Sequence, residues 1–549
     1  MLSTIRSLNS VSNNEYTIVL YSSSWMQLMK TMSSLTVCLI AAFFLTTLCD
    51  GYKIMVLMPI ATGSAGILGD GIVNNLLQAG HEVTYVTGKL KKHPPPNLHQ
   101  VDVSNANEDK NRDKLLHLED LLEGKSKVGY ETVMEMIESL NRAVFLSPQF
   151  VELMGDKTKN FDAVIGLWMF SDIYSGLGHL FNCPFIWLST VEPHWMVMNL
   201  IDENTHPAYV PDMMSANIPP FTFTMRIKEL FTQIFGMALK FFFLNGYQTK
   251  AYEELLVPHI IKRGRDVVPL DVLKYNASLV LGNSHVSLGL ATRLPQAYKP
   301  IGGYHIDTVV KPLPDDLKKL LDNAKHGLIY FSMGSNLKSK YLPASIKKDL
   351  LDLFGSLKQT VLWKFEEVLP NLPSNVHIVH WAPQQSILAH PNCIFFISHG
   401  GLLSTTEAVH FGKPIIGIPV FGDQFNNVYR AVKKGFAKEV NLAYDMKDKL
   451  KAAIDDMLIN KSYAEKAKEL SLVYHDRPVH PAKEMVHWVE HVVKTRGAPH
   501  LRSPALDVPL YQKLYLDLIA LVLSVLYVVK KIAVKLCYSK KDMNKTKRD

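Results

Sequence analysis

The sequence is poor in cysteine, and its few cysteines are badly placed for cross-linking. Five occur in 549 residues; Cys38, Cys49 and Cys537 lie near the chain ends, so only Cys183 and Cys393 remain in the body. Two distant cysteines without Cys-x-x-Cys spacing exclude a disulfide framework and a structural zinc site. The body must therefore be stabilised by its hydrophobic cores.

No charge of one sign dominates the body of the chain. The formal net charge is +8, but eight lysines or arginines lie between Lys530 and Arg548, against the two acids Asp542 and Asp549. Without that segment the chain is close to neutral, and its basic residues form no pattern interleaved with aromatic residues. We therefore expect no nucleic-acid partner.

The longest apolar runs lie near the two ends of the chain. The run 35–48 follows a short basic start at Met29, which is the plan of a signal peptide. We therefore expect 1–51 to be a signal region. The polar residues before Met29 make the upstream extension doubtful, so Met29 or Met32 is a better candidate for the true start.

The second apolar run, 514–529, precedes a cluster of lysines. It predicts a transmembrane helix over 510–534 with a basic cytosolic tail over 535–549. A buried amphipathic C-terminal helix is the alternative. The first interpretation places the body in the lumen or outside the cell, where the sequons at Asn276 and Asn460 would be glycosylated.

Between these ends the chain alternates strand-like and helix-like segments in two series. The first series begins with YKIMVLMPI and the second with HGLIYFSMGS. Such alternation predicts a parallel sheet flanked by helices. We therefore expect an α/β fold with two Rossmann-like domains facing a cleft: an N-terminal domain over 52–300 and a C-terminal domain over 301–508.

Segment 221–248 carries an apolar helical face and few charges. A buried helix pair is one interpretation. The other is an interfacial element that touches a bilayer or lines a lipophilic acceptor pocket. The sequence leaves both open.

The most informative stretch begins at Trp381 and reads WAPQQSILAHPNCIFFISHGGLLSTTEAVHFGKPIIGIPVFGDQFNN. A buried strand ends at the His-Gly-Gly of 399–401, and we expect a helix to begin near Ser404, which has capping-box spacing to Glu407. Two glycines before a helix N-terminus leave backbone N–H groups pointing at open space, where the helix dipole adds positive potential. We therefore predict a phosphate site beyond the carboxyl end of this strand.

This stretch, together with SLVLGNSHVSLGLATRLPQAYKPIGGYHID, LIYFSMGSN and VLWKFE, resembles the UDP-glycosyltransferases. That family includes the animal UDP-glucuronosyltransferases, and the wording is nearest to the arthropod branch. The resemblance implies a GT-B-like fold and an inverting, metal-independent transferase without a cofactor. Its substrates would be a UDP-sugar and a small lipophilic acceptor. It also implies a single-pass protein of the endoplasmic reticulum membrane, in contact with membrane lipid, and favours glucose as the transferred sugar.

The resemblance also implies roles for single residues. Trp381 would stack on uracil, and Gln384 would hydrogen-bond near the nucleoside. His399, Gly401 and Ser404 would hold the diphosphate. A planar aromatic ring suits a base, and a helix N-terminus suits phosphates.

Four more residues complete the donor site that the resemblance implies. Ser335 would add a contact to the diphosphate, and Glu407 would accept hydrogen bonds from the ribose hydroxyls. Asp423 and Gln424 would bind hydroxyls of the donor sugar, which suits paired carboxylate and amide side chains.

In this family a histidine after the first strand deprotonates the acceptor hydroxyl, and a carboxylate further along orients that histidine. By the family's pattern these positions fall at Ser64 and Leu167. No His, Cys, Lys, Asp or Glu lies between Pro59 and Asp70. The glycine-rich turn that begins at Gly63 therefore shapes a pocket but supplies no base.

Three interpretations of the missing base remain. The acceptor needs little deprotonation, as an amine, acidic phenol or carboxylate would; losing a general base typically costs about 10²–10⁴-fold, which a good nucleophile offsets. Alternatively another group serves, with Glu192 and His194 as weak candidates and Asp70 or Asp172 as further ones. The third is a non-catalytic relative that binds a UDP-sugar or a lipophile. A nicotinamide-dependent dehydrogenase is disfavoured, because the first turn has Gly-x-x-Gly-x-x-Gly spacing.

Overall fold

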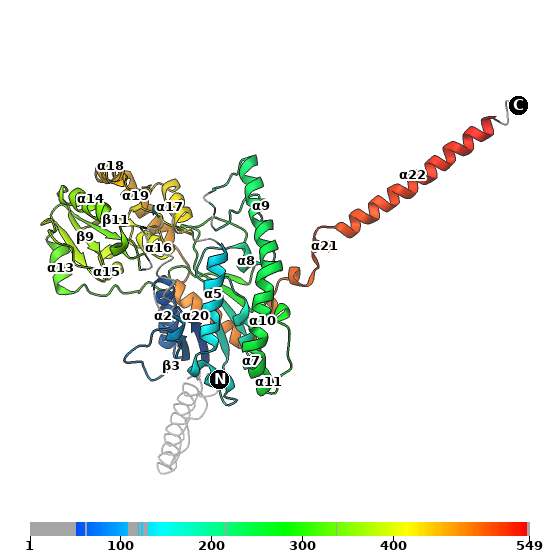
Figure 1. Ribbon diagram of the computed structural model, residues 1–549, viewed down its shortest axis with the longest axis horizontal. Helices are drawn as coiled ribbons and strands as arrows, with labels where there is room; N and C mark the ends of the chain where they lie inside the picture. Colours follow the sequence, from blue (N-terminus) through cyan, green and yellow to red (C-terminus); the bar gives the residue numbers. More distant parts are fainter. Residues whose placement is uncertain are drawn as a thin grey trace, which may run out of the picture. The chain divides into compact units, whose positions relative to one another are not determined.

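A computed structural model describes residues 51–545, except for 61–62, 108–118, 120–121, 124–129, 214, 216 and 336. Nearly all of the predicted signal region therefore lies outside the described residues. The described chain forms two parallel sheets flanked by helices, as the alternation of segments predicts (Figure 1).

The first sheet has seven parallel strands in the order β3-β2-β1-β4-β5-β6-β7. The strands are β1 (Lys53–Met58), β2 (Glu82–Thr87), β3 (Leu98–Asp102), β4 (Ala163–Trp168), β5 (Phe185–Ser189), β6 (Leu279–Gly282) and β7 (Tyr298–Pro300). The helices and 3₁₀ turns before the long helix described below are α2 (Gly63–Gln78), η1 (Ser104–Asn107), α5 (Tyr130–Phe145), α6 (Pro148–Gly155), η2 (Ile173–Ser175), α7 (Gly176–Phe181) and α8 (Trp195–Met198). The strand order reverses between β1 and β4, which creates a topological switch point.

The second sheet has six parallel strands in the order β10-β9-β8-β11-β12-β13. The strands are β8 (Leu328–Ser332), β9 (Thr360–Lys364), β10 (Val376–Val379), β11 (Cys393–Ser398), β12 (Ile415–Gly417) and β13 (Ala437–Glu439). The helices are α13 (Asp315–Asp322), η4 (Ser339–Tyr341), α14 (Ala344–Gly355), α15 (Gln384–Ala389), α16 (Leu402–His410), α17 (Gln424–Lys433), α18 (Met446–Ile459) and α19 (Ser462–His475). Its switch point lies between β8 and β11.

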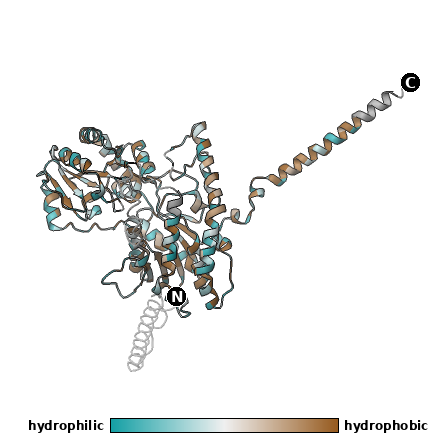
Figure 2. Cartoon of the chain, viewed as in Figure 1, coloured by the Kyte–Doolittle hydropathy of each residue, from teal (hydrophilic) through white to brown (hydrophobic). Residues whose placement is uncertain are grey.

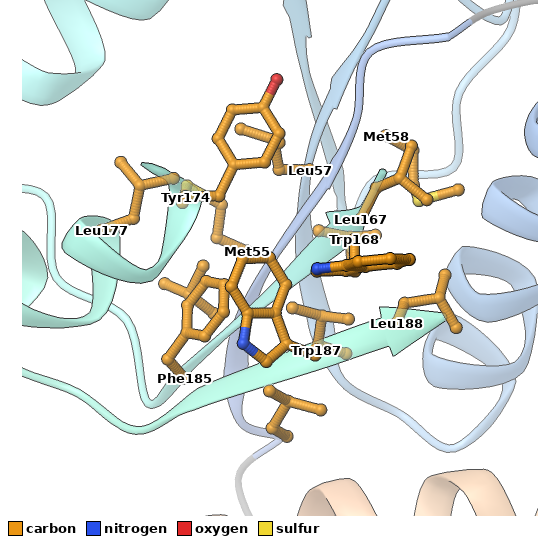
Figure 3. Packing of buried hydrophobic residues seen from close by; sticks show 14 of the residues in the cluster. Met55, Leu57, Met58, Leu167, Trp168, Tyr174, Leu177, Phe185, Trp187 and Leu188 are labelled. Atoms are coloured by element: carbon orange, nitrogen blue, oxygen red, sulfur yellow. The ribbon is translucent and has the colours of Figure 1, made fainter. Parts of the chain in front are cut away.

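The strands of the first sheet are apolar because helices cover both of its faces. All six residues of β4 are buried. Figure 3 shows Met55, Leu57, Leu167, Trp168 and Trp187 packed together in this core. A near-continuous apolar strand is what a sheet covered on both faces requires.

The end of the predicted C-terminal domain packs on the first sheet. α20 (Pro481–Lys494) contacts α2 and β4, and Met485, Val489 and Val492 belong to the core of the first sheet. The sequence assigned α20 to the C-terminal domain, 301–508, whereas the structure packs it in the core of the first sheet. The reason is that these three residues, at positions i, i+4 and i+7, form an apolar stripe on α20 that the first sheet buries.

Of the two interpretations of 221–248, the buried helix pair is wrong. α9 (Phe223–Leu239) continues through the π-helical turn η3 (Lys240–Leu244) into α10 (Asn245–Leu255), which gives one long helix (Figure 1). Large apolar side chains on it are exposed, such as Phe231 at 69% and Phe242 at 72%. Two short helices follow, α11 (Val257–Lys262) and α12 (Leu270–Leu273).

The C-terminal segment differs from the single helix predicted over 510–534. After η5 (Pro499–Leu501) and η6 (Pro504–Asp507), it forms α21 (Leu510–Lys513) and α22 (Leu516–Lys545), which are separated by Tyr515 at φ 54°. The predicted tail 535–549 is helical as far as it is described.

Figure 2 shows hydrophobic residues along much of α22. Asp517 and Lys530 bound its uncharged stretch, which contains Ser524, whereas a span needs about 20 apolar residues. Within the described part of the chain, no helix is both long and apolar enough to cross a membrane. The predicted transmembrane helix is therefore not supported.

Candidate active site

A cleft of about 1330 Å³ lies between the two sheets. One wall is a face of α2, with Ser64, Asp70 and Asn74 among its residues. The other wall comes from the ends of β8 and β9 and from the starts of α15 and α16. The cleft therefore stands near the switch point of each sheet, where doubly wound proteins bind ligands.

Most of the predicted donor residues meet in this cleft. Those that line it are Ser335, Trp381, Gln384, His399, Ser404 and Glu407. They come from loops and helices that follow different strands of the second sheet, so only the fold brings them together.

The N-terminus of α16 lies where the sequence predicts a phosphate site, but the helix begins earlier than expected. Gly401 is the N-cap, and the N–H of Thr405 donates to its carbonyl oxygen at 3.0 Å. The predicted capping box between Ser404 and Glu407 is therefore wrong. Gly400 lies before it at φ 78°, a left-handed conformation that suits glycine. No side chain caps α16, so its first N–H groups are available to an anion.

Two glycines leave the space that the His399 ring occupies. A Cβ atom on Gly334 would lie 2.5 Å from its Cε1, and one on Gly401 would lie 2.5 Å from its Nε2. Burial, with a smaller effect of the Lys364 cation, lowers the pKa of His399 to about 4. The imidazole is therefore neutral near pH 7 and can donate one N–H to an anionic oxygen.

Glu407 stands at the centre of a polar network on the cleft wall. Gln384 Nε2 donates to its Oε2 at 2.6 Å, and Gln385 Nε2 donates to its Oε1 at 3.1 Å. His305 Nε2 lies 3.4 Å from the same Oε1. These partners orient the carboxylate, as a ligand for vicinal hydroxyls requires. Gln384 also donates to Ser404 Oγ at 3.3 Å, so it links the predicted nucleoside and diphosphate subsites.

Among the many lining residues that were not predicted as site residues, three lie close to predicted ones. Lys364, at the end of β9, places its Nζ 3.0 Å from the carbonyl oxygen of Gly334 and 2.6 Å from Glu366 Oε1. His305 and Gln385 line the cleft as well. All three lie in segments that resemble the family: GGYHID, VLWKFE and WAPQQ. A polar residue that follows a strand-like run was the signal by which the sequence could have identified them as site residues.

Trp381 lies at the rim of the cleft and is 65% exposed, so a ring face is accessible to a planar base. By contrast, Gly401, Asp423 and Gln424 are not among the described residues that line the cleft. Gln424 Oε1 accepts from the backbone N–H groups of Val420 at 2.9 Å and Phe421 at 3.2 Å. Its side chain therefore stabilises the loop before α17.

Asp423 is tied to its own helix, since Asn427 Nδ2 donates to its Oδ2 at 2.9 Å. Burial raises the pKa of this carboxyl. Asn427 also donates to the carbonyl oxygen of Gly400 at 3.1 Å, which connects Asp423 to the phosphate site through one side chain.

The wall of the cleft that we expect to bind the acceptor is built on helix α2. This helix begins at Gly63, so Gly66 and Gly69 lie within a helix and not in the expected turn. Gly69 allows close packing on the sheet, because a Cβ there would lie 2.6 Å from Tyr85 Oη. Ser64, in the first turn of α2, lines the cleft; it is the residue that we expect at the family's histidine position.

Neither Leu167 nor His194 offers chemistry to this cleft. Leu167 is 1% exposed within the core of the first sheet. His194 is the N-cap of α8: its Nδ1 accepts from the Met196 N–H at 3.4 Å, and its Nε2 lies 3.1 Å from Asp212 Oδ2. Both nitrogens of this buried ring are engaged, which fits a structural histidine better than a base.

Glu192 lines a separate, water-sized cavity of about 10 Å³ beside α17. Its Oε2 lies 4.0 Å from Arg430 Nη1, and its buried Oε1 has no hydrogen-bond partner. Burial raises the pKa of Glu192 to about 7, with Arg430 and Lys434 opposing the effect. The structure therefore separates Glu192 from the large cleft and pairs it with a cation.

The two further candidates for the base differ. Asp172 is 2% exposed and forms an ion pair with Lys240 at 2.8 Å, so it is a structural carboxylate. Asp70 lines the cleft, and burial raises the pKa of its carboxyl against the nearby cations Lys91 and Lys89. Among the proposed substitutes for the family histidine, Asp70 is the one that faces the ligand space.

Comparison with known proteins agrees with this geometry. The family model "UDP-glucoronosyl and UDP-glucosyl transferase" matches residues 53–548. UDP-glucosyltransferase 2 of Dactylopius coccus is 32% identical, over 88% of this chain and 93% of its own length. UDP-glucuronosyltransferase 2B13 of Oryctolagus cuniculus is 33% identical over 60% of this chain and 61% of its own length.

The fold has a solved counterpart as well. The crystal structure of CalG4, the calicheamicin glycosyltransferase, aligns with a TM-score of 0.51 at 15% identity, over 81% of this chain and 99% of that chain. At that identity the likeness concerns the two-domain fold alone. The family match and the insect relative show that the chain belongs to the UDP-glucoronosyl and UDP-glucosyl transferase family and is a UDP-sugar-dependent glycosyltransferase.

Proposed function

We propose that this transferase moves glucose from UDP-glucose to a small lipophilic acceptor, with inversion at the anomeric carbon. One observation carries the proposal: the nucleoside, phosphate and ribose residues of the family pattern meet in one cleft that faces α2. The choice of glucose is supported by the insect relative, whose name is UDP-glucosyltransferase 2.

In this proposal the second sheet stabilises the departing UDP. The N–H groups at the start of α16 and the neutral His399 donate to the diphosphate, and the Lys364 ammonium at the same wall adds positive potential. These groups are oriented before the reaction, so they stabilise developing negative charge without reorganisation. We propose that no metal ion takes part, because the helix N-terminus and the cation supply the needed charge.

We further propose that the preferred acceptors are easily deprotonated or already nucleophilic, such as acidic phenols, amines or carboxylic acids. By the family's pattern the base position falls at Ser64, which lines the cleft, and its carboxylate partner falls at Leu167, which is in the core. Asp70 is the remaining ionisable side chain on this face of α2. Loss of the general base would slow ordinary alcohols by about 10²–10⁴-fold.

The test is a product screen. Membranes that carry the chain are incubated with UDP-glucose or UDP-glucuronate and a mixture of phenols, alcohols, amines and carboxylic acids, and conjugates are identified by mass. Glucosides of the better nucleophiles that disappear with His399→Ala are the expected result. Glucuronides alone would contradict the sugar assignment, and alcohol glucosides at equal rates would contradict the acceptor assignment.

The base position can be tested separately with Ser64→His. This variant should accelerate transfer to weakly acidic phenols, with Ser64→Ala as the matched control. The gain should be partial because the new histidine lacks a carboxylate partner. The family's partner position falls at Leu167, in an apolar core where an unpaired charge would be strongly unfavourable. No gain with Ser64→His, in a folded protein that binds UDP, would count against the alignment.

We also propose that the body lies in the lumen of the endoplasmic reticulum and that α22 attaches it to the membrane. Apolar side chains of α22 are about half exposed, and lysines follow them. Asn276 and Asn460 are both exposed, so both sequons are accessible to glycosylation. Glycosidase treatment should lower the apparent mass of wild type, and the shift should be smaller for Asn276→Gln. An unchanged mass for wild type would argue against a lumenal body.

A further inference from the structure

His305 is a buried histidine whose ring nitrogens both lack a hydrogen bond. Its side chain is 0% exposed, and neither nitrogen has a hydrogen-bond partner among the described residues. Burying such a polar ring is unfavourable unless a neighbouring group compensates for the lost water. Glu407 is that neighbour, because its Oε1 lies 3.4 Å from His305 Nε2. The ring therefore faces the carboxylate to which the family pattern assigns the ribose.

The segment that carries His305 is fastened to both walls of the cleft. On the wall formed by α2, Asn75 Nδ2 donates to the carbonyl oxygen of Tyr304 at 2.9 Å. On the opposite wall, Gln385 Oε1 accepts from the N–H of Asp307 at 3.3 Å. These bonds hold the backbone on either side of His305, and close packing holds the buried ring itself. The ring therefore has little freedom to turn away from the carboxylate.

Protein groups take up most of the hydrogen-bonding capacity of Glu407. A carboxylate has about four sites for hydrogen-bond donors. Gln384 donates to Oε2 at 2.6 Å and Gln385 donates to Oε1 at 3.1 Å, while His305 Nε2 faces Oε1 as well. The remaining capacity is therefore on Oε2. Because the side chain of Glu407 is only 5% exposed, water has little access to it, and an acceptor left without a donor here is unfavourable.

We propose that His305 makes the donor site selective for a ribonucleoside diphosphate over its deoxyribonucleoside counterpart. The inference rests on the proposed function, which places the ribose of UDP at Glu407. A ribose hydroxyl completes the donors around Oε2, whereas a nucleotide that lacks this hydroxyl leaves a buried carboxylate oxygen incompletely paired. His305 acts through Glu407 as a positioning residue. By facing Oε1, it keeps the carboxylate turned so that Oε2 is the acceptor offered to the ligand.

The test measures nucleotide binding by titration calorimetry on the full chain, so it needs no acceptor. UDP, 2′-deoxy-UDP and 3′-deoxy-UDP are the ligands. Wild type should bind at least one deoxy analogue about 10–100-fold more weakly than UDP, which is the usual effect of one hydrogen bond to a charged group.

His305→Ala should reduce this preference for UDP to about threefold or less, because water then reaches Oε1 and the carboxylate is free to turn. The loss should come from weaker binding of UDP, with the affinity for the deoxy analogue unchanged. That unchanged affinity also shows that the variant is folded and that the rest of the site is intact.

Two conservative variants distinguish positioning from packing. In His305→Gln the side-chain amide nitrogen reaches about as far as Nε2, whereas in His305→Asn it reaches about as far as Nδ1. The first variant should keep most of the preference for UDP, and the second should lose it. His487→Ala is the matched control, since this exposed histidine of α20 also lines the cleft. It should bind all three nucleotides as wild type does.

The possible failures give different patterns. The same preference for UDP in wild type and in His305→Ala would overturn the inference and leave the proposed function intact. Equal ratios for His305→Gln and His305→Asn would overturn it as well. If wild type binds UDP and both deoxy analogues equally, the assignment of the ribose to Glu407 fails, and the inference fails with it. If wild type does not bind UDP, the proposed function itself is wrong.

Discussion

The substitution Gly401→Ala should displace a residue of the predicted donor site without unfolding the chain. At φ −61° and ψ 146°, the backbone of Gly401 suits any residue, so alanine there meets no conformational strain. Its Cβ, however, would lie 2.5 Å from His399 Nε2, against an ordinary contact of at least 3.4 Å. The imidazole must therefore move by roughly 0.9 Å, and a displacement near 1 Å typically costs about 10²-fold in rate.

The assay measures kcat/KM with UDP-glucose and the best acceptor from the product screen, together with the melting temperature. Gly401→Ala should lose about 10²-fold in kcat/KM and keep its melting temperature within a few degrees. Gly246→Ala is the matched control, because a Cβ at this glycine of α10 would meet no atom within 4 Å. It should leave kcat/KM unchanged.

A double-mutant cycle identifies the route of the effect. If Gly401→Ala acts by displacing the imidazole, it should cost little in a His399→Ala background. An equal loss in both backgrounds would refute the displacement argument and point to obstruction of the phosphate site itself. Full activity of Gly401→Ala would refute the role of His399 as well.

Three further predictions concern other parts of the chain. Lys240→Met should leave buried Asp172 without its cation and lower the free energy of unfolding by about 3–5 kcal/mol in urea titrations, whereas Lys250→Met, at an exposed site, should change it little. Trp381→Ala should raise KM for the UDP-sugar by about tenfold or more with kcat nearly unchanged, if the ring stacks on the base. Burial raises the pKa of Glu192 to about 7, against 4.5 for an ordinary glutamate, so in the folded state it keeps its proton up to about pH 7. Stability of wild type relative to Glu192→Gln should therefore fall by about 3 kcal/mol between pH 4.5 and 7, as unfolding titrations at several pH values can show.

The backbone geometry at the predicted phosphate site was predictable from the sequence because it is local. A buried strand, two glycines and a helix start within a few residues, so 399–401 and the first turn of α16 occupy the expected place. Even here the sequence did not determine the residue at which α16 begins. Gly401 and Ser404 are both common N-cap residues, and their contacts in the fold decide between them.

Other site features required tertiary structure because their partners lie far apart in sequence. His305 reaches Glu407 from the segment between the two sheets. Glu192 lies near Arg430, which is still further away in the chain, so its charge environment was invisible in the local sequence. Leu167 could be counted to a family position, but only the sheet shows that it belongs to the core.

Which face of a helix is buried is the other feature that the sequence did not determine. Apolar spacing alone marks α9 and α20 as amphipathic, and a hydrophobic face is ordinarily placed against a core. For α20 that holds, although the core is that of the first sheet. For α9 the hydrogen bonds of Glu229 and Gln233 and the ion pair of Lys240 turn the polar side inward. Periodicity states that a helix has two faces; which one is buried depends on partners that the helix does not itself contain.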